Sequence, residues 1–446
     1  MANYNRDAIK FYSGVDLHKR KSYLYVIDIN GDKVSSKEIA TTQKDFETFF
    51  SPYVSSGILV AVEISSMTFW LCDVLYAMGV KVYVVNTLEN HYLSRSVKKT
   101  DKEDARKLAI QLWKDILPCP VYIPKKEERD LRRLVSQRHS LVKSVTRVMN
   151  RTGHLLSNYE IKFSRRALSA AKRWQQLHES FEAGQNPVKA KVIRIRRSRV
   201  SRVPTSPKGN LTERVLEVDH VDHVDHVGHV GHVDHVDQVD QVDPMLLGEF
   251  TLQYGQFKLF KDQISRVEKS LQSHLDQTPR LNAMYQLLLT IPGMGPITSS
   301  ALIGCIGDIN RFGSGRQMVS YLGLCPKVRE SAGKSLSNGS ITKRGNSRLR
   351  GYFVQASVAL LSSRNSKAQP LKEWYERIRR KKGWRTARIA LARKLGLIAF
   401  GVLKTNTPYD PEKVTKKKVT VTNTNTNTNT DTNTDADAKA KPNQRD

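Results

Sequence analysis

The chain has 446 residues, with 73 Lys and Arg against 43 Asp and Glu, giving a formal net charge of +30. This length allows two or three domains, and the excess charge favours a polyanionic partner, nucleic acid before a membrane surface. The sequence has neither an apolar run of about 18 residues nor a signal peptide, so we expect a cytoplasmic protein. Its four scattered cysteines form no C-x-x-C pair, which argues against a zinc ribbon or a disulfide framework.

The first hundred residues alternate between strand and helix patterns. Three consecutive strands are expected within residues 11–40, with Asn30-Gly31 as the hairpin turn between the second and the third. The further expected elements are a helix over 41–53, a strand over 57–63, a helix over 67–79, a strand over 80–86 and a helix from Thr87. Three meandering strands followed by two strand–helix units predict a mixed α/β sheet.

The next region is helical and highly charged. From 125 to 182 the apolar residues form a narrow stripe typical of a helical hairpin or coiled coil, made of Leu131, Leu134, Leu141, Val145 and Val148. Residues 245–281 could be the return arm of this hairpin.

A segment of different composition separates the two expected helical arms. Residues 189–202 carry seven basic residues and no acid, and they fit either a flexible nucleic-acid arm or a solvated linker. A three-residue repeat follows, with histidines at every third position from His220 to His235. That period suits neither a helix nor a strand, so we predict disorder, with adventitious metal binding as the alternative. The tail after Pro408 is also predicted to be disordered.

Four acids stand out in the N-terminal region. Asp101 and Asp104, in "KKTDKEDARKLA", share a face if the segment is helical, although a solvated helix face would also explain them. Asp16 lies in the apolar stretch "SGVDLH" and Glu63 ends "ILVAVE", where burial of a lone charge would be costly. If the fold gathers these oxygen ligands, they suit Mg²⁺ or Mn²⁺. Two such ions about 4 Å apart can clamp a phosphodiester.

The C-terminal region predicts a second compact domain. "LLLTIPGMGPITSSALIGCIGDINRF" indicates helix, glycine-rich turn, helix, and the turn fits either a helix-hairpin-helix element or a simple helix–helix connection. In the first case Gly293 and Gly295 would let backbone amides approach a phosphate. The basic and aromatic run from Glu376 to Lys394 fits phosphate contact or a solvated helix.

Taken together, these stretches resemble the DEDD-type transposases of bacterial insertion sequences, the IS110 family, and the related Piv-type DNA invertases. The matching segments include "GVDLHK", "VAVE", "KKTDKEDARKLA", "IPGMGP", "YLGLCPK" and "SAGKSLSNGSITKRGN", and they cover most of 11–110 and 284–405. The resemblance implies an RNase H-like N-terminal fold close to that of Holliday-junction resolvases. It also implies that four acids hold the catalytic Mg²⁺ or Mn²⁺, namely Asp16, Glu63, Asp101 and Asp104.

The resemblance further implies a serine nucleophile from the second domain. The family's serine maps to Ser331, followed by Ala332 where relatives often have serine. Less favoured rivals follow closely, at Ser335, Ser337 and Ser340. A serine that attacks a phosphodiester needs charge neutralisation, which three neighbouring basic residues could supply, Lys334, Lys343 and Arg344.

We therefore predict a transposase or site-specific DNA recombinase. The expected domains are an RNase H-like catalytic domain at 1–115, a helical hairpin at 116–185 and 245–283, a disordered insert at 186–244, a mainly α-helical serine-bearing domain at 284–405 and a disordered tail at 406–446. The resemblance implies a bacterial, nucleoid-associated protein that works on DNA as a homo-oligomer, a dimer pairing into a tetramer. Several relatives are guided by a structured RNA encoded beside the transposase gene. The alternatives are a metal-dependent resolvase-type nuclease and an inactive nucleic-acid-binding protein.

Overall fold

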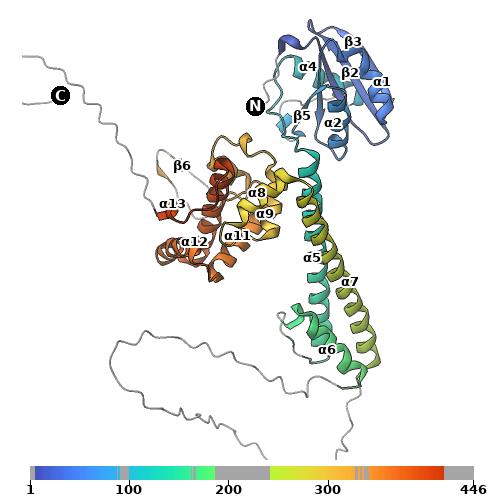
Figure 1. Cartoon of the computed structure of the whole chain (residues 1–446). Helices are drawn as coiled ribbons and strands as arrows, with labels where there is room; N and C mark the ends of the chain where they lie inside the picture. The colour runs from blue at the N-terminus through green and yellow to red at the C-terminus, as the bar shows by residue number, and fades with distance from the viewer. Residues whose placement is uncertain are drawn as a thin grey trace, which may run out of the picture. The chain divides into compact units, whose positions relative to one another are not determined.

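The computed structural model describes residues 6–87, 89–90, 100–161, 163, 167–185, 242–326, 330–331, 334–335 and 341–415. The chain divides into two compact units, residues 1–285 with 299–311, and residues 286–298 with 312–446 (Figure 1). The histidine repeat and the tail beyond residue 415 lie outside the described residues.

A five-stranded sheet organises the first unit. Its order is β3-β2-β1-β4-β5, in which β1 to β3 pair antiparallel and β1, β4 and β5 pair parallel. The strands are β1 (Phe11–Asp16), β2 (Lys21–Asp28), β3 (Lys33–Ala40), β4 (Ile58–Glu63) and β5 (Lys81–Val85). The predicted mixed sheet is therefore confirmed.

The hairpin between β2 and β3 turns where the sequence predicts it. Gly31 has a φ of +89°, a region that glycine enters without steric cost. The Asp28 carboxylate accepts hydrogen bonds from the backbone N–H groups of Asn30 and Asp32, both at 2.9 Å. These contacts fix the turn and hence the pairing register of the two strands.

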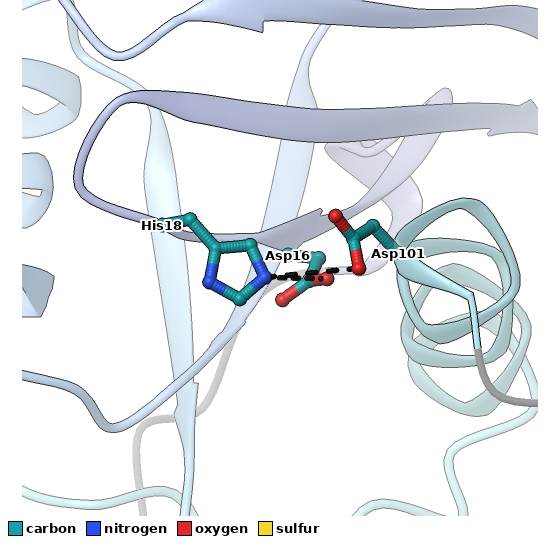
Figure 2. Close-up of side chains that lie close together, drawn as sticks. All are labelled: Asp16, His18 and Asp101. Atoms are coloured by element: carbon teal, nitrogen blue, oxygen red, sulfur yellow. Dashed lines mark hydrogen bonds and ion pairs between the residues drawn. The ribbon is translucent and has the colours of Figure 1, made fainter.

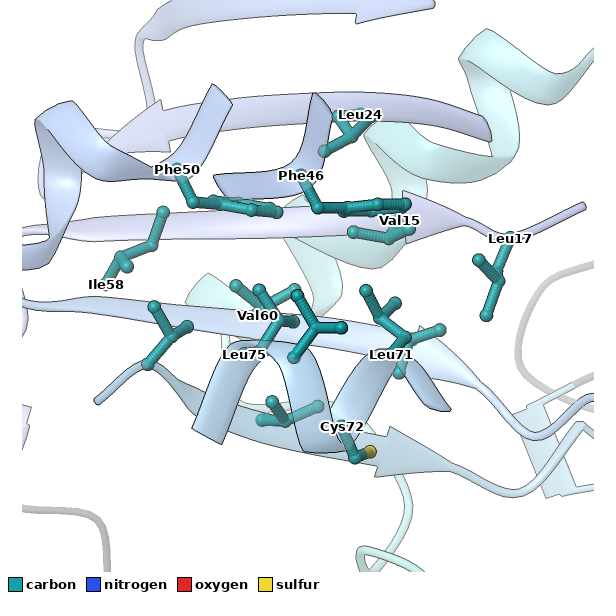
Figure 3. Packing of buried hydrophobic residues seen from close by; sticks show 14 of the residues in the cluster. Val15, Leu17, Leu24, Phe46, Phe50, Ile58, Val60, Leu71, Cys72 and Leu75 are labelled. Carbon is teal, nitrogen blue, oxygen red and sulfur yellow. The ribbon is translucent and has the colours of Figure 1, made fainter. Parts of the chain in front are cut away.

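One face of the sheet is covered by α1 (Gln43–Val54) and α2 (Thr68–Ala77). Helix α1 begins at Thr42, whose hydroxyl accepts a hydrogen bond from the Asp45 N–H. Alternate strand residues such as Val15 and Val60 pack on this side against the helices' apolar side chains, including Phe46 and Leu71 (Figure 3). Their burial is the main source of stability for this layer.

The opposite face is covered by α4 (Asp101–Trp113), which Thr100 caps by accepting from the Glu103 N–H. The helix lies unusually close to the sheet at Gly14. A Cβ on Gly14 would stand 2.0 Å from the Ala105 carbonyl oxygen and 2.6 Å from the Ala109 nitrogen. Glycine is therefore required in the middle of β1 for α4 to lie where it does.

Two long helices form the predicted hairpin, α5 (Lys126–Asn158) and α7 (Pro244–Asp276), which lie side by side (Figure 1). They run antiparallel, because Arg138 pairs with Glu268 at 2.6 Å and Thr152 bonds to Gln253 at 2.5 Å. The helical region expected over 125–182 is divided into separate elements. Helix α5 ends at Asn158, followed by Glu160 at φ +57°, η2 (Ala167–Ser169) and α6 (Ala171–Glu182).

Two ion pairs, each with one buried member, hold the N-terminal end of α5. Arg129, 7% exposed, contacts both carboxylate oxygens of Asp73 on α2, at 2.7 and 2.5 Å. Glu128, 1% exposed, accepts from Arg280 at 2.7 Å and from the Lys125 N–H at 2.9 Å. Each buried charge therefore has a partner, as the cost of desolvation requires.

The second unit is mainly helical, as expected. It holds all or part of α8 (Pro279–Leu289), α9 (Pro296–Ile306), α10 (Gly315–Tyr321), α11 (Ser347–Ser362), α12 (Gln369–Thr405) and α13 (Glu412–Thr415), with the short strands β6 (Glu330–Ser331) and β7 (Lys334–Ser335). Short 3-10 turns are η1 (Arg6–Ala8), η3 (Ile309–Arg311) and η4 (Ser366–Ala368). None of the helices in the described ranges combines the length and apolarity needed to cross a membrane. All four cysteines are free thiols.

We expect Gly14→Ala to destabilise the chain by about 3 kcal/mol, because the new methyl group can be accommodated only if the backbone of α4 moves. Urea denaturation followed by circular dichroism measures this. Gly255→Ala is the matched control: it lies within α7 with no atom within 4 Å of the added Cβ, so it should stabilise by about 0.5–1 kcal/mol. Equal stabilities for the two variants would contradict the close packing of α4.

Candidate active site

Asp16 and Glu63 end two neighbouring parallel strands. Val15 pairs with Val62 across β1 and β4, so the two acids follow at the same edge of the sheet. Because side chains alternate along a strand, Asp16 lies on the face of Gly14, and Glu63 on the face of Ala61, which is buried against α4. Both carboxylates therefore leave the sheet on the side that α4 covers.

The first turn of α4 reaches the same edge. Asp101 and Asp104 both lie in this turn, confirming that the segment is helical. Carboxylates are favoured at a helix N-terminus by the free N–H groups and the helix dipole. The contact of Gly14 with Ala105 sets the height of the helix above β1, and so brings Asp101 close to Asp16.

Three potential ligand atoms converge there. One donor atom each from Asp16, His18 and Asp101 lies within 4.8 Å of the other two (Figure 2). The His18 Nε2 is 3.2 Å from the Asp16 Oδ2 and 3.9 Å from the Asp101 Oδ1. The Asp16 side chain is 21% exposed, whereas His18 and Asp101 are more than half exposed, at 56% and 65%. The cluster is therefore open to solvent on one side.

Asp16 carries the electrostatic cost of this arrangement. Its pKa is raised, first because burial disfavours the charged carboxylate, while His18 lowers it and the negative charges of Asp101 and Asp104 raise it further. Asp104 is thus electrostatically coupled to the cluster, and it also pairs with Lys107 at 3.8 Å. A bound cation would relieve the repulsion among these three carboxylates.

Glu63 lies outside the three-residue cluster. Its Oε1 accepts a hydrogen bond of 2.9 Å from the Asn90 side-chain amide, which orients the carboxylate. Asn90 is 4% exposed, and its own Oδ1 is buried without a hydrogen-bond partner among the described residues. The structure therefore brings Asp16 and Asp101 together with His18, keeps Asp104 in the same helix turn as Asp101, and places Glu63 at the adjoining strand end.

The donor set fits a divalent cation. Carboxylate oxygens suit Mg²⁺ and Mn²⁺, and a neutral imidazole nitrogen is a better ligand for Mn²⁺ and later transition metals than for Mg²⁺. Sequence reasoning missed both His18 and Asn90. The signal for His18 was its position two residues after Asp16, while nothing local marked Asn90, which reaches Glu63 only through the fold.

Ser331 lies in the second unit. Its backbone belongs to β6 and pairs antiparallel with Lys334 of β7. Ala332, Ser337 and Ser340 lie outside the described residues, as do the side chains of Ser331, Lys334 and Ser335. Lys343 has a φ of +57°, and its carbonyl accepts from Arg350 at 3.0 Å. Arg344 follows it, just before Gly345 at φ +96°.

The glycine-rich turn joins α8 to α9, as the sequence predicts. Gly293 has a φ of +86°, and a Cβ there would lie 2.4 Å from the Ala356 carbonyl oxygen of α11. Packing against α11 is thus enough to require this glycine. A Cβ on Gly295 would meet nothing within 4 Å. Phosphate binding by the two glycines stays a prediction.

Two family models match separate parts of the chain. A model for a DEDD transposase of the IS110 type matches residues 13–161, and a model described as the transposase IS116/IS110/IS902 family matches residues 285–373. The chain belongs to this transposase family. The first match holds the sheet and its acids, and the second holds Ser331 and the glycine-rich turn.

Two of the individual proteins similar to this chain are named transposases, and a third is named a pilin gene-inverting protein. A probable family 20 transposase of Pseudomonas aeruginosa is 29% identical over 38% of this chain, and the transposase of insertion sequence element IS1328 of Yersinia enterocolitica is 32% identical over 37%. The pilin gene-inverting protein of Moraxella bovis is 31% identical over 34% of the chain. The matched regions span 48%, 48% and 46% of these relatives, about half their lengths.

We expect Asp16→Asn to raise the melting temperature by a few degrees at neutral pH in EDTA. Since the folded-state pKa of Asp16 is raised above 3.8, its contribution to stability is complete below that pH and is lost as pH rises through the folded-state pKa. The neutral amide avoids this loss. Melting curves from pH 3.5 to 8 test it: the gain should vanish at the acid end, and a variant less stable at neutral pH would contradict it.

Proposed function

We propose that this transposase cuts and rejoins DNA strands at the ends of an insertion sequence. The observation that carries the proposal is the meeting of Asp16 with the first turn of α4 at the edge of the sheet, within the segment that the DEDD transposase model matches. Acids collected in this way, in a chain of net charge +30, suit a metal-assisted reaction on a polyanionic phosphodiester.

The strand order supports an RNase H-like domain at residues 1–115. Three antiparallel strands continue into two parallel ones, β4 and β5, and the acids stand at the ends of the central strands β1 and β4. In this proposal the hairpin helices at 116–185 and 245–283 mediate assembly, and the domain at 284–405 supplies the serine. In the proposed assembly, dimers pair into a tetramer on DNA, and the protein is associated with the bacterial nucleoid.

Four acids would hold Mg²⁺ or Mn²⁺: Asp16, Glu63, Asp101 and Asp104. Such an ion, when bound, supplies Lewis-acid polarisation of the phosphate oxygens. His18 would join as a nitrogen ligand, because its Nε2 already lies among the carboxylate oxygens of Asp16 and Asp101. Asn90 would act by positioning, since it fixes the Glu63 carboxylate from a buried site.

Ser331 would be the nucleophile. Its Oγ forms a bond to phosphorus, the phosphorus–oxygen bond to the leaving deoxyribose breaks, and the leaving oxygen takes up a proton. A DNA hydroxyl then attacks the phosphoserine and restores the serine, so no bond energy is lost to water. Lys334, Lys343 and Arg344 would offset the charge that develops on the phosphate. A structured RNA that selects the DNA, as in several relatives, is part of the proposal.

The metal site is tested by Mn²⁺ binding to the full chain. We expect Asp16→Asn and Asp101→Asn to weaken Mn²⁺ binding tenfold or more, measured by calorimetry, because each removes an oxygen ligand. Electron spin echo modulation from a ¹⁴N nucleus should appear with one equivalent of Mn²⁺ and disappear in His18→Gln. The exposed His154 on α5 gives the matched control, and His154→Gln should keep the signal. Loss of the nitrogen signal in both variants, or in neither, would remove His18 from the ligand set.

The serine is tested by trapping the covalent intermediate. Purified protein is incubated with element-end DNA, any cognate RNA and Mg²⁺, and then denatured before electrophoresis. We expect DNA attached to protein, lost by at least a hundredfold in Ser331→Ala and retained in the matched variant Ser335→Ala. The DNA is the labelled species, so free and attached strands are counted together.

Other outcomes of this assay would replace the proposal. Free cleaved ends that persist in Ser331→Ala would show a resolvase-type nuclease that uses water. Binding without cleavage, unchanged in Asp16→Ala, would show an inactive nucleic-acid-binding protein.

A further inference from the structure

Helix α12 is broken near its middle. Gly383 has φ +77° and ψ 163°, a backbone conformation that is essentially restricted to glycine. The run on both sides of this break, residues 377–388, is here called the basic elbow. All its residues from Arg379 to Thr386 are exposed, so the break presents a strip of side chains to solvent.

The basic elbow concentrates positive charge. Six of the nine residues from Arg377 to Arg385 are Lys or Arg, and the sequence has no acid from Arg377 to Thr405. In the part of the chain that the structure describes, the single carboxylate paired with the elbow is that of Glu376, whose Oε2 lies 2.6 Å from the Arg379 Nε. The other charges repel each other without compensation, which a polyanion would relieve.

An exposed tryptophan organises two of these charges. Trp384 is 51% exposed, and the guanidinium carbons of Arg385 and Arg388 lie 5.2 and 4.9 Å from its ring centroid. Both cations share one ring, so they are at most about 10 Å apart, within about one Debye length at 0.1 M salt. The Arg388 Nε is buried and has no acceptor among the described residues. The indole thus holds two like charges in place by cation–π attraction.

We propose that the basic elbow binds the sugar-phosphate backbone of duplex DNA. Guanidinium groups match phosphate in charge and geometry, and a stacked guanidinium keeps its N–H donors free at the ring's edge. The charge density of the elbow favours regularly spaced phosphates over isolated carboxylates. The choice of DNA as the polyanion rests on the proposed function, whereas the binding itself requires neither Asp16 nor Ser331.

The test is a salt titration of DNA affinity with the full chain. A fluorescein-labelled 30-base-pair duplex of arbitrary sequence is titrated by anisotropy in EDTA, between 50 and 300 mM salt. The elbow variant combines three exposed substitutions, Arg380→Gln, Lys381→Gln and Arg385→Gln. We expect affinity at 100 mM salt to fall at least tenfold, and the slope of log K against log salt to become shallower by about 2–3.

The control is a second triple variant that loses the same number of positive charges as the elbow variant. Lys33→Gln, Lys37→Gln and Lys44→Gln also remove three exposed positive charges, from β3 and α1. We expect a change of less than threefold and a slope altered by less than 1. Equal losses in both triple variants would overturn the proposal, because they would show a general charge effect rather than a site.

A single substitution tests whether the placement of Arg385 and Arg388 by the ring matters for DNA binding, separately from their charge. Trp384→Leu keeps every positive charge but removes the ring beneath Arg385 and Arg388, and should weaken DNA binding about threefold to tenfold. Trp384→Tyr should restore most of the affinity. An unchanged melting temperature confirms that both variants are folded.

Two results distinguish this proposal from that for the active site. If the elbow variant loses affinity for a 30-nucleotide RNA but keeps duplex DNA binding, the DNA assignment is overturned. If elbow substitutions weaken DNA binding as expected while no covalent DNA link forms in the serine assay, the elbow stands and the proposed recombination chemistry fails. The EDTA in the binding assay makes the two measurements independent.

Discussion

The close approach of α4 to the sheet at Gly14 is the constraint on which the candidate site depends. A side chain at that position would collide with backbone atoms of Ala105 and Ala109, so the helix can be this near only over glycine. The first turn of α4 therefore lies beside the end of β1, and Asp101 comes within reach of His18 and Asp16. A residue without any functional group thus sets the geometry of those that have one.

This closeness has an electrostatic cost. Asp16 is partly buried and faces the negative charges of Asp101 and Asp104, with His18 as the nearest compensating group. Selection for stability alone would not favour this arrangement, because Asp16 loses hydration on burial and lies near two like charges. The proposed cation site gives a reason for accepting the cost, since such a site must bring its ligands together before the cation arrives.

The same logic applies at the basic elbow in the second unit. Like charges are held together there by the break at Gly383 and by the Trp384 ring, and within the described part of the chain only the Glu376 carboxylate is paired with them. In both places the fold keeps one sign of charge concentrated at an exposed position. The acids suit a metal ion, and the guanidinium groups suit phosphate, so the two sites are chemically complementary parts of one proposed activity on DNA.

The sequence by itself determined most elements of the first unit, because their signals are local: alternation in the strands, the Asn30-Gly31 turn and the apolar stripe of α5. Resemblance added the family and the four acids. Only the tertiary structure decided which groups meet. The roles of Gly14 and Asn90 depend on contacts between residues far apart in the chain, and the position of His18 among the carboxylates depends on where α4 lies. Local pattern cannot encode such contacts, because they arise from the packing of one element against another.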